Sequence, residues 1–167
     1  MTRLFTTTAL AVLLAARPLA AGVPPCQTPK DVAAMQFRQL QAELMVAALK
    51  CGGGATAFDF NGAYAIFVRM ARPDLIHNAG QLRAMFARAG MGAGAIDDYQ
   101  TELSNNAEIE SQTAKDYCGG AALAMAYIVQ LPRSELGAYA ARTIPVPFGA
   151  NACSAPVREA ADGRNPS

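Results

Sequence analysis

The chain has 167 residues and a formal net charge of +1, with 14 basic and 13 acidic side chains. No basic block occurs along it, which argues against a nucleic-acid partner. It contains four cysteines, one histidine and no tryptophan, so a metal site built from several histidines is excluded.

The N-terminus has the pattern of a secretory signal peptide. Arg3 precedes an uncharged run, Leu4 to Ala16, and small residues follow it. The run is about a dozen residues long, whereas a helix needs roughly 20 to span a bilayer, so a cleaved signal is favoured over a membrane anchor. We expect residues 1–22 to be removed. The mature protein is then expected to be periplasmic or secreted, with no membrane span.

A first helix is predicted from Pro29 to Lys50. Thr28 can cap its N-terminus, and proline suits the first helical position. Apolar residues recur at steps of three and four, which predicts a core-facing stripe. The stripe consists of Ala33, Phe37, Leu40, Leu44, Ala47 and Cys51. Because the last turns, 44–49, are apolar all round, this end of the helix is expected to be buried on several sides.

A second helix is predicted over residues 58–89, although Pro73 lies within it. An interior proline removes one hydrogen bond and clashes one turn back. The stripe of inward positions nevertheless keeps its phase through the proline, which favours one kinked helix over two separate ones. These positions are Phe60, Tyr64, Phe67, Ala71, Leu75, Asn78, Leu82, Met85 and Ala89. The glycine-rich segment 89–95 is predicted to be a turn.

Three more helices are predicted in the second half of the chain. The first covers residues 96–117, with inward positions Ile96, Tyr99, Leu103, Ala107, Ala114 and Tyr117. Residues 121–131 are apolar on every face and too few for a membrane span, so they are predicted to form a central core helix. A short helix follows over residues 134–141, and the prolines after it predict an extended segment.

The pattern as a whole predicts an all-α fold, a disulfide-stapled bundle of four to five helices. Residues 23–153 are expected to form this single helical domain. The segment 154–167 has no apolar period and is expected to be a disordered C-terminal tail.

Four cysteines in an exported chain predict two disulfides, because that compartment is oxidising. Cys26 and Cys51 flank a helix of about 21 residues, which is roughly 30 Å long. They cannot pair, since bonded cysteines have Cα atoms about 4.4–6.8 Å apart. A continuous second helix favours Cys51–Cys118 together with Cys26–Cys153. If Pro73 reverses the chain, the pairs become Cys26–Cys118 and Cys51–Cys153, and this alternative stays open.

The sequence offers little for catalysis or for a cofactor, and no metal or cofactor is expected. The cysteines are 25, 67 and 35 residues apart, unlike the clustered ligands of zinc or iron–sulfur sites. The single histidine, His77, is interpreted as an ordinary surface or core residue. The glycines after Cys51 and Cys118 are interpreted as helix C-caps rather than phosphate loops. Asp98 and Glu102 share a helix face, for which solvation is the simpler interpretation.

The polar segment 99–111 is the one candidate site. Thr101, Asn105 and Asn106 lie in the middle of a helix that otherwise packs inward. Asparagine is a poor interior helix former, so these residues are interpreted as contacts to a partner helix or to a ligand.

Three runs, "LQAELMVAALKC", "FVRMARPDLIHNAGQLRAMFARAG" and "DDYQTELSNNAEIES", resemble small exported helical proteins of bacteria with four cysteines. The resemblance covers about residues 40–118. It is compatible with a helical bundle and implies no activity or catalytic residue.

The signal-peptide pattern predicts an exported helical protein. Because the sequence offers no recognisable set of catalytic residues, the protein is predicted to be non-enzymatic. It would act by binding an unknown protein partner, or as an accessory or structural component of the envelope. One alternative is a carrier of a small apolar ligand or lipid, with a cavity between the alanine-rich helices. Another is a carboxylate-based enzyme.

Overall fold

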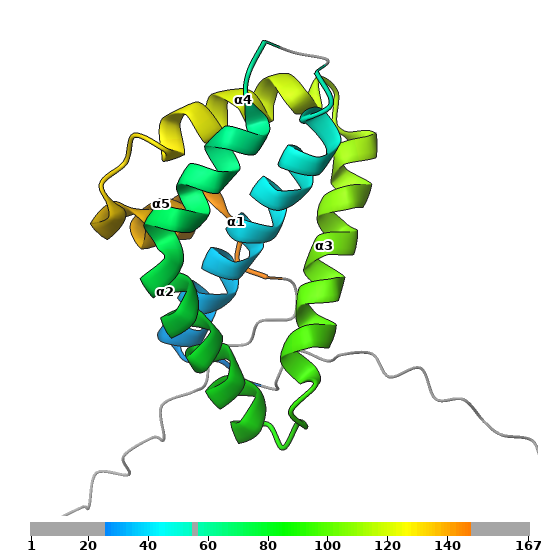
Figure 1. Cartoon of the computed structure of the whole chain (residues 1–167). Coiled ribbons are helices and arrows are strands. Elements are labelled where there is room, and N and C mark those ends of the chain that lie inside the picture. Colours follow the sequence, from blue (N-terminus) through cyan, green and yellow to red (C-terminus); the bar gives the residue numbers. More distant parts are fainter. Residues whose placement is uncertain (1–25, 55–56, 148–167) are drawn as a thin grey trace, which may run out of the picture.

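A computed structural model describes residues 26–54 and 57–147, and in this part of the chain every regular element is a helix (Figure 1). The helices are α1 (Pro29–Cys51), α2 (Phe60–Arg88), α3 (Ala95–Thr113), α4 (Tyr117–Ile128), the 3-10 helix η1 (Arg133–Glu135) and α5 (Leu136–Thr143). The predicted all-α, disulfide-stapled bundle is confirmed. The expected signal peptide and C-terminal tail lie outside the described residues.

Helix α1 is the central helix of the bundle. It contacts α2, α3, α4 and α5, and it runs between α2 and α3 in Figure 1. The prediction that residues 121–131 form the central helix is wrong, since Leu123 is 77% exposed and Tyr127 is 54% exposed. Helix α4 has 12 residues against 23 in α1, so it covers only part of the length of the bundle. It packs through Met125 and Ile128 and leaves its outer face in solvent.

The start of α1 is closed by a reciprocal cap. The Thr28 hydroxyl accepts a hydrogen bond from the Asp31 backbone N–H at 3.2 Å, and the Asp31 carboxylate accepts one from the Thr28 backbone N–H at 2.8 Å. The predicted cap at Thr28 and proline at the first turn are therefore confirmed. Asp31 also forms a 2.6 Å ion pair with Arg88, which ties the first turn of α1 to the last turn of α2.

Helix α2 continues through Pro73, so the prediction of one helix rather than two is confirmed. It changes direction near its middle, as Figure 1 shows. Because α2 runs down the bundle and α3 runs back up, the end of α1 and the start of α4 meet at one pole.

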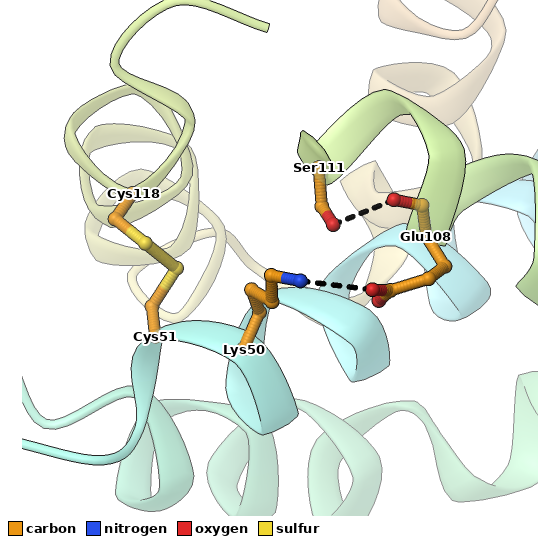
Figure 2. Close-up of a disulfide and its surroundings, with 5 residues drawn as sticks. All are labelled: Lys50, Cys51, Glu108, Ser111 and Cys118. Carbon is orange, nitrogen blue, oxygen red and sulfur yellow. Dashed lines mark hydrogen bonds and ion pairs between the residues drawn. A yellow bond between two sulfur atoms is a disulfide. The ribbon is translucent and has the colours of Figure 1, made fainter. Parts of the chain in front are cut away.

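Cys51 and Cys118 form a disulfide at this pole, with their Cα atoms 5.7 Å apart (Figure 2). This confirms the first of the favoured pairs. The second, Cys26–Cys153, includes a residue outside the described part of the chain.

The glycines beside the disulfide differ from the prediction that both groups are helix C-caps. Cys118 lies in the first turn of α4, so Gly119 and Gly120 are helical rather than terminal. Helix α3 ends at Thr113, and the chain turns at Asp116, which has a left-handed φ of 55°. Gly52 does cap α1, but with a right-handed φ of −72°, while Gly54 takes the positive φ, 87°. The prediction was wrong at Cys118 because a separate turn precedes α4.

The core consists of two clusters on opposite sides of α1. One lies against α2, α4 and α5 and includes Phe37, Leu44, Phe60, Phe67, Met125, Ile128 and Leu136. The other lies against α2 and α3 and includes Met35, Leu82, Met85, Phe86, Ile96 and Tyr99. Two predicted inward positions, Ala33 and Ala114, are exposed. Ala33 is exposed because no helix covers it: it lines a groove between α1 and α5.

Candidate functional site: a groove between α1, α2 and α5

A groove of about 730 Å³ opens where the first half of α1 meets the middle of α2 and the start of α5. Its apolar surface comes from Ala33, Ala34 and Phe37, and of these Ala34 and Phe37 are buried. The remaining lining is mostly polar: Lys30, Asp74, His77, Asn78, Gln81, Arg133, Ser134 and Gly137. An apolar base with convergent polar groups is the usual composition of a small-molecule site.

One wall of the groove is held by an ion pair between Asp74 of α2 and Arg133 of η1. Arg133 donates from Nε to Asp74 Oδ2 at 2.8 Å and from Nη2 to Oδ1 at 3.2 Å. This two-point geometry matches the fork of a guanidinium to both oxygens of a carboxylate. Both side chains are partly exposed, at 55% and 36%, so we assign the pair a role in orientation rather than a large role in stability.

Asn78 lies at the buried side of the groove and is 5% exposed. Its amide nitrogen donates to the Ala34 carbonyl at 2.7 Å, and its amide oxygen accepts from Arg38 Nε at 2.8 Å. Asn78 therefore joins the groove to an interior polar network between α1 and α2.

Arg38 is the centre of that network and is only 7% exposed. Its other hydrogen bonds go to Gln41 Oε1 at 2.8 Å, Gln100 Oε1 at 3.3 Å and the Leu75 carbonyl at 3.2 Å. All these acceptors are neutral, and within the described residues Arg38 forms no ion pair. Burial lowers the pKa of Arg38, and the nearby charge of Arg83 lowers it further. The guanidinium ordinarily titrates so far above neutrality that it remains a buried positive charge.

Four polar side chains of the lining are open to a ligand. Lys30, His77 and Ser134 are exposed and Gln81 is half-buried, and within residues 26–54 and 57–147 none of their side chains forms a hydrogen bond or ion pair. Asp74 is paired with Arg133, so the charge of Lys30 gives the described lining an excess positive charge.

A second, smaller cavity of about 170 Å³ lies between α1, α3, α4 and α5, and Glu43 and Glu110 both line it. Burial raises the pKa of Glu43, and the charge of Glu110 raises it further, against a hydrogen bond from Gln39. Burial and the same acidic surroundings raise the pKa of Tyr117 to about 12. The nearby Glu108 is separately paired with Lys50 at 2.9 Å (Figure 2).

The residues that the sequence indicated as a site lie elsewhere. Thr101, Asn105 and Asn106 are exposed on α3, and the Thr101 hydroxyl donates to the Asp97 carbonyl of its own helix at 2.9 Å. Asn106 lines a hollow of about 80 Å³ beside Glu43 and Glu110. Their role as a contact to a ligand or partner stays a prediction.

The groove residues were missed because they come from three distant segments of the chain. Only Asn78 carried a signal: it is a polar residue at an inward position of an apolar stripe, and such a residue must find buried partners. Asp98 and Glu102, the predicted carboxylate pair, are exposed on α3 and line none of the three cavities.

The fold and this site define a disulfide-crosslinked all-α protein with a groove of mixed polarity. No known family model, curated protein or solved structure matches the chain. In the described part of the chain, no helix combines the length and apolarity needed to cross a membrane.

Proposed function

We propose that this chain is an exported, non-enzymatic binding protein that holds a small molecule in the groove between α1, α2 and α5. The observation that carries the proposal is the groove itself. Its volume of about 730 Å³ falls within the range of roughly 300–1,000 Å³ that is usual for small-molecule sites. Its lining offers apolar contact on Ala33, Ala34 and Phe37 and polar groups on Lys30, His77 and Gln81.

A periplasmic or secreted location is part of this proposal. The signal-peptide pattern supports it, and so does the Cys51–Cys118 disulfide, because such bonds persist mainly in oxidising compartments. The ligand is one that reaches the protein outside the cytoplasm.

Binding is favoured over hydrolysis although Ser134, His77 and Asp74 all line the groove. A hydrolytic triad needs the acid to orient the histidine and the histidine to contact the serine. Here the Asp74 carboxylate binds Arg133, and within the described residues no hydrogen bond links His77 to Ser134 or Asp74. Hydrolysis of p-nitrophenyl acetate that Ser134→Ala abolishes would contradict the proposal.

The binding proposal is tested with N-phenylnaphthylamine, a neutral apolar dye whose fluorescence rises in a dry site. We expect saturable binding by the intact, oxidised protein. Ala33→Phe fills the groove from an exposed position of α1 and is expected to weaken binding at least about tenfold, which is about 1.4 kcal/mol. Ala87→Phe places the same ring on an equally exposed alanine of α2 outside the groove and is the matched control.

Equal affinities for the two variants and the unsubstituted protein would show that the dye binds outside the groove. Absence of dye binding, like an unchanged affinity in Ala33→Phe, would overturn the proposed function.

A further inference from the structure

Among the described residues, the lining of the groove has no unpaired carboxylate. Asp74 is the only acidic residue of this part of the chain that lines it, and both of its oxygens accept hydrogen bonds from Arg133. Lys30 stands in the first turn of α1 with its ammonium unpaired among the described residues. The lining thus presents donors and positive charge, beside a buried apolar base of Ala34 and Phe37.

A second positive charge stands directly behind the lining. Among the described residues Arg38 is buried without a carboxylate partner, and it is joined to the groove by Asn78, whose oxygen accepts from Arg38 Nε at 2.8 Å. Burial and the charge of Arg83 lower the pKa of Arg38, while Tyr64 and Tyr99 act in the opposite direction. Charges in the low-dielectric interior are screened less than charges in water. The buried side of the groove therefore has a positive charge behind it with which no carboxylate of the described residues forms an ion pair.

From this charge distribution we propose that the ligand is an amphipathic organic anion, a carboxylate or sulfonate on an apolar body. The apolar body lies on Ala33, Ala34 and Phe37, and the acidic group faces Lys30 and the amide of Asn78. The inference rests on the proposed function of the groove and adds that its ligand is negatively charged.

Two dyes that differ only in charge separate this inference from the proposed function. Anilinonaphthalene sulfonate carries the same fused and phenyl rings as N-phenylnaphthylamine, with one sulfonate added. We expect the sulfonate to bind the oxidised protein about two- to fivefold more tightly than the neutral dye, as one exposed charge contact allows. Ala33→Phe is expected to weaken the binding of both dyes.

Lys30→Glu is expected to weaken the binding of the sulfonate more than the binding of the neutral dye, and so to remove the preference for the sulfonate. The fold should tolerate it, since an acidic residue suits the first turn of a helix. Lys115→Glu, between α3 and α4 and outside the groove, makes the same change in net charge and is expected to keep the preference.

Equal affinity for the two dyes, or the same loss in Lys115→Glu as in Lys30→Glu, would overturn the anion inference while leaving the groove as a binding site. If neither dye binds, or if Ala33→Phe leaves both affinities unchanged, the proposed function fails and the inference fails with it.

Discussion

Arg38 Nε donates a hydrogen bond to Asn78 Oδ1 at 2.8 Å in the interior between α1 and α2. The two residues are 40 positions apart, and both are more than nine-tenths buried. Arg38 joins α1 to α2 and to Gln100 of α3, so three helices share one guanidinium. Asn78 orients it and at the same time forms the buried side of the groove. The contact between Arg38 and Asn78 therefore contributes both to the stability of the bundle and to the lining of the groove.

Asn78→Ala is predicted to lower the free energy of unfolding by about 2–3 kcal/mol, because it leaves the buried Nε donor of Arg38 unpaired and removes the side-chain hydrogen bond to the Ala34 carbonyl. Asn105→Ala and Asn106→Ala remove exposed asparagines from α3 and are predicted to cost no stability and to raise it by up to about 0.7 kcal/mol each, because alanine is the better helix former. Urea denaturation followed by circular dichroism measures all three. A cost for Asn78→Ala as small as for the exposed pair would show that the interior network adds nothing to stability.

The double variant Cys51→Ala/Cys118→Ala is predicted to be less stable by about 2–4 kcal/mol, because the bond closes a long loop and limits the unfolded ensemble. The two cysteines are 67 residues apart. Urea denaturation of the variant against the oxidised parent gives the difference. Peptide mapping of the unreduced protein checks the pairing: a crosslinked peptide that joins Cys26 to Cys118 is incompatible with it.

Asp31→Asn is predicted to cost about 1–3 kcal/mol at neutral pH, because it weakens the cap on α1 and the ion pair with Arg88. Burial alone raises the pKa of Asp31, but hydrogen bonds from Arg88 and Thr28 outweigh it and hold the pKa below its ordinary value. A lowered folded-state pKa adds stability above the unfolded pKa of about 3.9, and this stability is lost as the pH falls through the folded value.

The stability difference between the parent and Asp31→Asn should therefore be full at neutral pH and shrink below a pH of about 4. Arg88→Gln removes a partner that is 55% exposed and should cost at most about 1 kcal/mol. If the stability difference between the parent and Asp31→Asn stays constant down to acidic pH, the pKa of Asp31 is not lowered in the folded state.

Glu43→Gln is predicted to raise the melting temperature at neutral pH. Burial and the charge of Glu110 raise the pKa of Glu43. Tyr117 and Tyr139 line the same cavity from α4 and α5, and none of the described residues that line it is basic. A raised carboxyl pKa means that the folded state binds the proton more tightly than the unfolded state. Stability contributed by this group is then present at acidic pH and lost as the pH rises through the folded value.

Differential scanning calorimetry between neutral pH and a pH of about 4.5, near the unfolded pKa of glutamate, measures the effect. As the pH falls, the melting temperature of the parent should approach that of Glu43→Gln. Glu102→Gln, exposed on α3 and outside the three cavities, is the matched control. If Glu43→Gln lowers the melting temperature at neutral pH, the ionised carboxylate of Glu43 does not destabilise the folded protein.

The helices themselves were predictable because their signals are local. Thr28 and Pro29 define the start of α1, and the phase of the apolar stripe carries α2 through Pro73. Helical continuity there was enough to select Cys51–Cys118 among the possible pairs. Which helix is central was not predictable from hydropathy: the alanines and glycines of α4 make it apolar on every face, but they have little side-chain area to bury.

By itself, the sequence determined the all-α class and the extents of α1 and α2, and it favoured the pairing of Cys51 with Cys118, because capping, proline and helical period act within a few turns of chain. Only the tertiary structure decided that Lys30, Asp74, His77, Asn78 and Arg133 line one groove. Lys30 and Arg133 are more than 100 residues apart, and their approach depends on how α5 returns along α1. Such an approach follows from packing between helices, which no local pattern in the sequence records.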